Sequence, residues 1–252
     1  MNEELVSIIT PVYNSEKFIN ETATSVFNQT YTNWEWILID DCSTDKSWYI
    51  LNKLSERDSR VKIYKNTKNL KSGITRNLAI KKAEGDYIAF LDSDDLWHKD
   101  KLAIQIPFMK ENNYFFSHTS YGYIDEKGDK IKSTLHVSIE VSYKQLLKRT
   151  EISCLTAIYN ANKIGKFYMS EHANKQDYAL WLKILKSGVK SYGIDQELAY
   201  YRQVNNSATS NKYKLILKHI LFLKETQSFS TLEALYYTAY WMINGFVRFF
   251  VK

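Results

Sequence analysis

Three carboxylates follow directly on a short apolar run. Residues 87–91 have the composition of a buried strand, and Asp92, Asp94 and Asp95 come immediately after it. Carboxylates this close repel one another unless a cation or tight hydrogen bonding compensates their charge. Mg²⁺ and Mn²⁺ prefer oxygen ligands, and Mg²⁺ commonly uses one or two carboxylates together with substrate phosphates. For an isolated Asp-x-Asp-Asp, a helix-capping acidic turn is the stronger interpretation, so the neighbouring elements must decide.

Four apolar runs of strand length alternate with segments of helical period over the first hundred residues. The runs are 5–12, 34–39, 61–64 and 87–91. Such alternation predicts a parallel sheet built from right-handed β–α–β units. Ligands of such sheets bind beyond the carboxyl ends of the strands. We therefore expect Asn14, Asp41 and Asp94, which each follow a run, to lie together at one rim.

Capping residues predict where the helices begin and end. Ser15 is expected to cap a helix that runs to about Phe27, and Asp45 to cap the helix that carries Trp48. Further helices are expected through residues 75–80 with closure at Gly85, from Asp95 to about Asn113, and over 177–187 with closure at Gly188. A strand is expected over 114–124.

Length and charge limit the classes of protein that the chain can represent. Its 252 residues can bury one main α/β domain with an appendage. The net charge of +6 favours an anionic partner, such as a nucleotide or a phospholipid surface. No nucleic acid is expected, because the chain has no basic run and no zinc-type Cys/His spacing. Cys42 and Cys154 are isolated, which fits a reducing cytoplasm.

Five motifs, in this order and spacing, give the chain a resemblance to a known family. They are Pro11-Val12-Tyr13-Asn14, Asp40-Asp41 with Ser43 and Asp45, Arg76-Asn77, Asp92-Ser93-Asp94-Asp95, and Gln176-Asp177-Tyr178 before Leu180-Trp181-Leu182. Together they resemble the family 2 glycosyltransferases, which are inverting enzymes with the GT-A fold. The resemblance covers about residues 5–210. It implies an α/β fold with a mostly parallel sheet, in which residues 1–100 bind the nucleotide sugar and 101–210 bind the acceptor.

The resemblance also implies a role for each motif. Asp177 matches the catalytic base, and Asp94 matches the metal-binding member of the acidic motif, with Mn²⁺ or Mg²⁺ as the cofactor. Expected nucleotide contacts are Pro11, Tyr13, Asn14, Asp41, Arg76 and Asp92. A solvated helix face would explain Arg76 equally well, and an N-terminal helix cap is the simple alternative for Asp177.

Three positions depart from the pattern of the family. Lys71 stands where a glycine is common, and Gln176 stands where a glutamate often precedes the base. The stretch after Arg202 lacks the histidine that often helps to hold metal or diphosphate, so a third protein ligand is left open. Expected further contacts to the diphosphate or the acceptor are Arg202, His172 and Trp181.

The last 42 residues, 211–252, differ in composition from the rest. Lysines alternate with apolar residues over 214–224, and a second helical segment carries Leu232, Leu235, Ala239 and Ile243 on one face. Glu233 and Asn244 interrupt the apolar character that a spanning helix needs. An interfacial helix that contacts the membrane surface is one interpretation. A helical pair packed on the domain, or a homodimer contact, is the other.

The leading hypothesis is metal-dependent, inverting transfer of a sugar from a UDP-sugar. The expected acceptor is a glycan or lipid-linked saccharide in surface polysaccharide synthesis, at the inner face of the cytoplasmic membrane. A nucleotidyltransferase that makes the activated sugar would need a glycine-rich, basic loop after the first strand, where Pro11 to Asn14 stand instead. A catalytically inactive nucleotide- or glycan-binding module is the third hypothesis, against which Asp94 and Asp177 argue.

Overall fold

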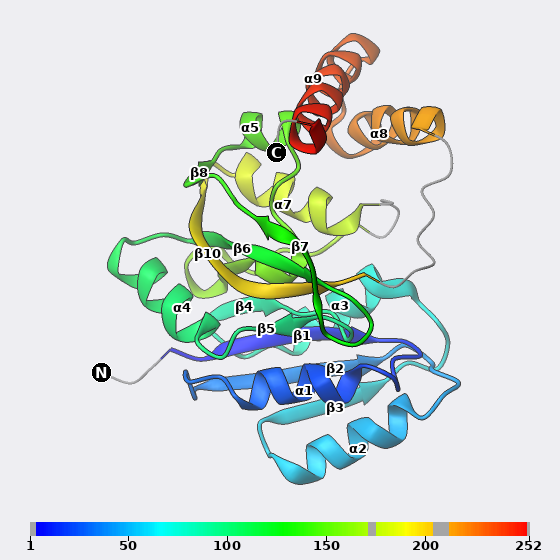
Figure 1. The fold of residues 1–252 in the computed structure, drawn as a ribbon, viewed down its shortest axis with the longest axis vertical. Helices are drawn as coiled ribbons and strands as arrows, with labels where there is room; N and C mark the ends of the chain where they lie inside the picture. Colours follow the sequence, from blue (N-terminus) through cyan, green and yellow to red (C-terminus); the bar gives the residue numbers. More distant parts are fainter. Residues whose placement is uncertain (1–3, 171–174, 204–211, 251–252) are drawn as a thin grey trace.

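A single mixed sheet organises the protein in the computed structural model, which describes residues 4–170, 175–203 and 212–250 (Figure 1). Ten strands run in the order β3-β2-β1-β4-β9-β6-β10-β5, with β7 paired to β6 and β8 paired to β10. Their bounds are β1 Val6–Val12, β2 Trp34–Asp40, β3 Val61–Lys65, β4 Tyr87–Phe90, β5 Leu96–Trp97, β6 Phe116–Ile124, β7 Lys130–Leu135, β8 Glu140–Val141, β9 Ile158–Asn160 and β10 Ser191–Arg202. The four strands predicted over the first hundred residues are confirmed, and they pair in parallel.

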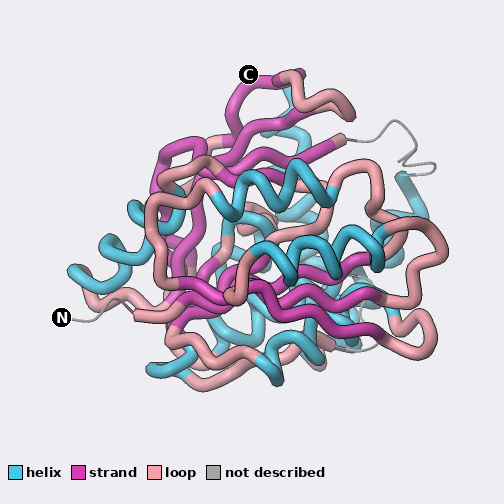
Figure 2. The backbone as a smooth tube through the Cα atoms, turned by 90° about the horizontal axis from the view of Figure 1, so that it is seen from below, coloured by secondary structure: helices cyan, strands magenta, loops and turns pink. Residues whose placement is uncertain are grey.

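Helices cover both faces of the sheet (Figure 2). They are α1 Ile19–Phe27, α2 Ser47–Arg57, α3 Lys71–Lys82, α4 Lys101–Glu111, α5 Tyr143–Lys148, α6 Ala161–Ile164, α7 Gln176–Lys186, α8 Lys212–Gln227 and α9 Thr231–Phe250, with a 3₁₀ turn at Cys154–Thr156. One core holds the apolar side chains of α1, α2 and α4, and the other holds those of α3, α5 and α7. Every residue of β2 is buried, because a parallel strand between two helical layers has no solvent face.

Three predicted helix limits are wrong. Helix α1 begins at Ile19 without a side-chain cap, because the Ser15 hydroxyl lies 2.7 Å from the Ser93 hydroxyl instead. Helix α3 ends at Lys82, three residues before Gly85, since Ala83 is already extended. Helix α4 begins at Lys101, because Leu96 and Trp97 first pair with β10 as strand β5.

Two other predicted helix ends are confirmed. The carboxylate of Asp45 accepts a hydrogen bond from the backbone N–H of Ser47, the first residue of α2, at 2.9 Å. Gly188 follows α7 with a φ of +94°, a left-handed conformation that glycine adopts without strain. The sequence therefore indicated the start of α2 and the end of α7 in their correct places.

The C-terminal helices α8 and α9 form a separate layer beside α5 and α7 (Figure 1). Phe222 and Leu223 of α8 and Ala234 of α9 are buried in the same core as α7. The alternative that the tail packs on the α/β domain is thus confirmed for one side of these helices. Within the described parts of the chain, no helix is long and apolar enough to cross a bilayer.

Candidate functional site

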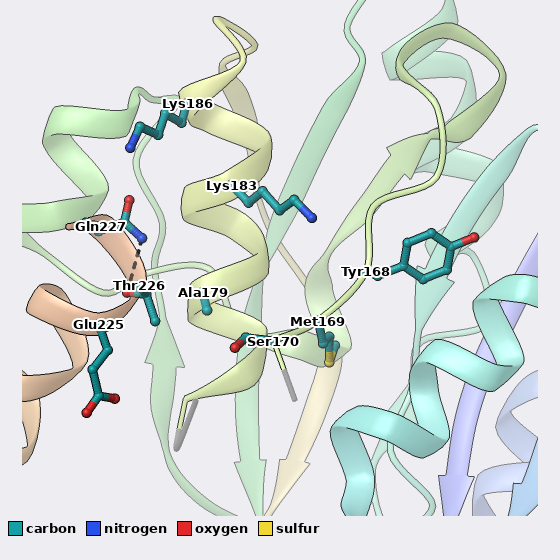
Figure 3. A pocket seen from close by; sticks show the side chains of 9 residues that line it. All are labelled: Tyr168, Met169, Ser170, Ala179, Lys183, Lys186, Glu225, Thr226 and Gln227. Carbon is teal, nitrogen blue, oxygen red and sulfur yellow. Dashed lines mark hydrogen bonds between the residues drawn. The ribbon is translucent and has the colours of Figure 1, made fainter. Parts of the chain in front are cut away.

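The carboxyl ends of β1, β2 and β4 surround a small polar pocket. Its volume is about 280 Å³. Most of the residues predicted from the sequence line it: Pro11, Tyr13, Asp41, Arg76, Asp92 and Asp94, with Val12, Ser72 and Ser93 between them. A larger cavity of about 670 Å³ lies between α7 and the end of α8 and includes none of the predicted residues (Figure 3). We therefore take the smaller pocket at the strand ends as the candidate site, because it holds the residues that could do chemistry.

Tyr13 and Asn14 form the loop after β1. The Tyr13 side chain is 51% exposed, so its ring is available as a flat platform for a base. Asn14 has a different role, because its side-chain oxygen accepts from the Thr44 N–H at 2.9 Å, while its own N–H donates to the Ser43 hydroxyl at 3.0 Å. Asn14 thereby joins the loops after β1 and β2 and does not line the pocket.

Asp41 is buried and lines the pocket. One carboxylate oxygen accepts from the Asn66 side chain and from the Leu70 N–H, both at 2.8 Å. The carboxylate thus fixes the loop that leads into α3. Lys71, at the start of that helix, has a φ of +70°. It thus adopts the left-handed conformation that a glycine, common at this position in the family, would adopt more easily.

Arg76 forms an ion pair with Asp92 in the centre of the site. The arginine is buried, and its Nε has no hydrogen-bond partner among the described residues. Burial opposes the charge on Arg76, but the carboxylates of Asp92 and Asp177 outweigh it and raise its pKa. Arg76 is therefore a buried cation, and the alternative of a solvated helix face is wrong.

The acidic turn after β4 carries charge that its surroundings do not fully compensate. Burial, and then the neighbouring charge of Asp92, raise the pKa of Asp94 to about 6. Burial also raises the pKa of Asp95, whose carboxylate accepts from the Arg202 N–H at 2.9 Å. Asp95 is thus tied into the fold, while Asp94 lines the pocket as the carboxylate that a cation would stabilise.

Arg202 holds the acidic turn in place. Its Nε donates to the Asp94 carbonyl at 2.7 Å, and its other nitrogens bind the Asp125 carbonyl and the Glu21 carboxylate at 3.0 and 2.5 Å. The side chain is completely buried. The predicted contact between Arg202 and a diphosphate is therefore wrong, because the guanidinium points into the fold and positions Asp94.

Asp177 lies in the first turn of α7, half-buried and electrostatically coupled to Arg76 and Asp92. Burial raises its pKa, Asp92 adds to the increase, and the Tyr178 N–H and Arg76 oppose it. A carboxylate with a raised pKa is a stronger proton acceptor, as a general base requires. The structure thus brings the predicted base and the predicted metal ligand to the same buried arginine.

Gln176 connects the start of α7 to the start of α3. Its side-chain oxygen accepts from the Ser72 hydroxyl at 3.3 Å, and its amide fills the space where a Cβ at Gly73 would stand. This contact and the pocket position of Ser72 were not predicted from the sequence. The signal was present, because Ser72 precedes Arg76 by one helical turn.

Of the remaining predicted acceptor contacts, one is contradicted by the structure and the other lies outside the described residues. Trp181 is fully buried, and its ring packs 5.3 Å from the rings of both Phe90 and Phe116. It is a core residue, so the predicted contact is wrong. His172 lies outside the described residues.

The donor set of the pocket fits a divalent cation that arrives with a nucleotide. Among the described residues, no three His, Cys, Asp or Glu side chains form a complete metal cage. Asp94 and Asp92 still offer hard oxygen ligands, and the raised pKa of Asp94 shows that its charge lacks compensation. Mg²⁺ commonly takes one or two carboxylates and completes its shell with phosphates and water.

Removing the Asp94 charge should stabilise the protein in the absence of divalent cations. Its pKa of about 6 lies above the ordinary 3.8, so the folded state binds the proton more tightly, and stability falls as pH rises from about 4 to 6. Asp94→Asn should raise the free energy of unfolding by roughly 1–3 kcal/mol at pH 7.5 and by almost nothing below about pH 4. Urea unfolding in EDTA tests this, with the exposed Asp129→Asn as control. A destabilised Asp94→Asn protein at pH 7.5 would contradict it.

Comparison with known proteins agrees with this site. The family model "Glycosyl transferase family 2" matches residues 7–172. The chain is 39% identical over 230 residues to the "Putative teichuronic acid biosynthesis glycosyltransferase TuaG" of Bacillus subtilis, which covers 91% of both chains. It is 39% identical over 247 residues to the "UDP-Glc:alpha-D-GlcNAc-diphosphoundecaprenol beta-1,3-glucosyltransferase WfaP" of Escherichia coli, covering 97% of this chain and 95% of WfaP.

Solved structures show the same fold. The S. aureus TarS 1-349 structure in complex with UDP-GlcNAc superposes with a TM-score of 0.73 at 23% identity, covering 97% of this chain and 73% of TarS. The family match spans more than half of the chain, and the relatives span almost all of it. The sheet, the acidic turn at its rim and these matches lead to one conclusion: the chain belongs to the bacterial family 2 glycosyltransferases and has the GT-A fold.

Proposed function

We propose that this glycosyltransferase moves a sugar from a UDP-sugar to a hydroxyl of a glycan or lipid-linked saccharide, with inversion at the anomeric carbon. The observation that carries the proposal is the convergence of Asp92, Asp94 and Asp177 on the buried Arg76, beside a pocket that Tyr13 lines. Two relatives support the donor class: WfaP uses UDP-Glc by name, and TarS was solved with UDP-GlcNAc.

In this proposal, the pocket binds the nucleotide. Pro11 and the exposed ring of Tyr13 pack against the uracil, and Asp41 accepts a hydrogen bond from the base with the oxygen that Asn66 and Leu70 leave free. Asp94, with Asp92 beside it, would hold Mn²⁺ or Mg²⁺, and the bound ion supplies charge compensation for the leaving diphosphate. Arg76 keeps Asp92 in place through their ion pair.

Asp177 acts on the acceptor. Its carboxylate accepts the proton of the acceptor hydroxyl while the hydroxyl oxygen bonds to the anomeric carbon and the bond from that carbon to the diphosphate breaks. A carboxylate is too weak a base to remove this proton beforehand, so bond formation and proton transfer are concerted. Attack opposite the leaving group inverts the anomeric carbon, and the products are UDP and the elongated glycan.

We also propose a lipid-linked acceptor in bacterial surface polysaccharide synthesis, at the inner face of the cytoplasmic membrane. The printed names of two relatives support this, because WfaP acts on a diphosphoundecaprenol-linked sugar and TuaG is assigned to teichuronic acid biosynthesis. The isolated Cys42 and Cys154, which are both free thiols, fit a reducing compartment.

A panel of UDP-sugars tests the proposed reaction. The full-length protein should release UDP from one donor with Mn²⁺ present, and should elongate a diphospholipid-linked monosaccharide that mass spectrometry can detect. Pyrophosphate release from UTP and a sugar phosphate would instead identify a nucleotidyltransferase. Saturable UDP-sugar binding with no turnover on any acceptor would identify a binding module.

A further inference from the structure

The inner side of the two C-terminal helices supports the helix that carries the candidate base. Lys175, one residue before α7, lies 3.3 Å from His219 of α8 and 4.5 Å from the ring of Trp241 of α9. Tyr178 stacks on Phe222 with ring centroids 5.2 Å apart. The tail is therefore joined to the α7 terminus at which Asp177 lies.

The opposite side of α9 is apolar and exposed. We call it the outer face, and it consists of Leu232, Leu235, Tyr236, Ala239, Tyr240 and Ile243. Their spacing of three and four residues places them on one side of the helix, while Ala234 and Thr238 are buried on the other. Leu232 is 79% exposed and Ile243 is 60% exposed. The face that the sequence predicted to be apolar thus points away from the core.

This surface is unusual for the protein as a whole. Nine of the fourteen large hydrophobic side chains that are exposed in the described parts of the chain belong to α8 and α9. Contiguous apolar surface of this kind marks a contact with another protein or with a membrane. Tyr237 and Asn244, by contrast, turn inward, and the Asn244 amide donates to the Lys148 carbonyl at 3.1 Å.

Positive charge borders the outer face. The Lys148 ammonium lies 4.6 Å from the ring of Tyr240 and 5.9 Å from that of Tyr236. Exposed lysines on α8 are Lys214, Lys218 and Lys224. Residues 212–250 contain five basic and two acidic residues. Aliphatic side chains with tyrosines and lysines at their border are the composition of a helix that lies in a lipid interface.

We propose that the outer face of α9 docks on an anionic lipid bilayer, with α9 parallel to the surface. Anionic headgroups complement the positive border, whereas a second copy of the chain would bring a second positive border against the first. Docking would hold Asp177 close to the bilayer through α7 and α8. This last consequence rests on the proposed function, because only a lipid-linked acceptor needs the base at that place.

Vesicle flotation of the full-length protein tests the docking surface. The probes are vesicles of phosphatidylcholine alone and of phosphatidylcholine with about one-third phosphatidylglycerol, at low and high salt. The test variant is Leu232→Glu/Ile243→Glu, and the matched control is Ile139→Glu, because Ile139 is also 79% exposed but lies outside the tail. Thermal unfolding should show that all three proteins are folded.

The wild type and Ile139→Glu should float with anionic vesicles, and high salt should weaken their binding. The double variant should bind about a hundredfold more weakly, since each buried aliphatic side chain contributes about a factor of ten. The proposal would be overturned if the double variant bound anionic vesicles as tightly as the wild type, or if the wild type did not bind vesicles. A wild-type dimer that the double variant dissociates would assign the face to a second copy instead. Turnover with a lipid-free acceptor analogue is measured in parallel. If the double variant loses vesicle binding but keeps this turnover, the docking surface and the proposed reaction are tested separately.

Discussion

Asp177→Asn should lower the rate of sugar transfer by about a hundred- to ten-thousand-fold, the usual cost of losing general-base assistance. The amide keeps the shape of the side chain and an oxygen near the Tyr178 N–H, so α7 should remain folded. The affinity for the UDP-sugar should change little, because the carboxylate acts on the acceptor. UDP release under saturating substrates gives the rate, and calorimetry with UDP gives the affinity.

The exposed Asp129→Asn is the control for this experiment, since it removes the same charge from the turn before β7. It should retain the wild-type rate. A near-normal rate for Asp177→Asn would mean that another carboxylate is the base. A matched loss of UDP affinity and rate would assign Asp177 to the nucleotide pocket.

The second large effect is expected at Asp94. Asp94→Asn should remove metal-dependent binding of UDP and lower turnover at least about a hundredfold, because the diphosphate would depart without compensation of its charge. Calorimetry of UDP with and without Mn²⁺ measures this for wild type, Asp94→Asn and Asp129→Asn. Wild-type affinity that is equal with and without Mn²⁺ would contradict the assigned role of Asp94.

The pH dependence of metal binding provides an independent test of the same role. Protons compete with the cation for the Asp94 carboxylate, whose pKa is about 6. Mn²⁺-dependent affinity for UDP should therefore be constant above pH 7 and should fall as the pH drops through about 6. An affinity that does not change over this interval would exclude Asp94 as a ligand.

Local patterns in the sequence were sufficient to predict the part of the fold that forms the site. The first four strands are short apolar runs between helices of clear period, and polar residues mark their carboxyl ends, so the rim with Asp41 and Asp94 follows from chain order. The position of β9 could not be derived in this way. It has only three residues, and its antiparallel pairing between β4 and β6 depends on contacts far apart in the chain.

Side-chain direction limited the prediction of individual roles. Trp181 follows Asp177 by one helical turn and shares its side of α7, but the helix enters the core between them, so the tryptophan is buried. Arg202 ends β10 near the acidic turn, and its direction is decided by partners from three distant segments at Glu21, Asp94 and Asp125. Contacts between segments so far apart in the chain cannot be predicted from the spacing of residues in the sequence.

For the C-terminal tail, too, the sequence did not determine which side chains point toward the core. The period of α9 indicated the two faces of the helix, but composition left open whether the more apolar face contacts a membrane, packs on the domain or forms a homodimer contact. The structure buries the other face, through Ala234, Thr238 and the half-buried Trp241, whose indole N–H donates to Thr150 at 3.1 Å. The choice depends on the shape of the surface formed by α5 and α7, which is not local information.

The anomeric configuration of the first product is the most direct measurement of the central claim. Proton NMR of the product formed from an α-linked UDP-sugar should show a β linkage at the earliest time points, because a single displacement with Asp177 as the base inverts the anomeric carbon. An α-linked first product would require a double displacement or front-face attack. Either mechanism would contradict the role assigned to Asp177 and the geometry proposed for this site.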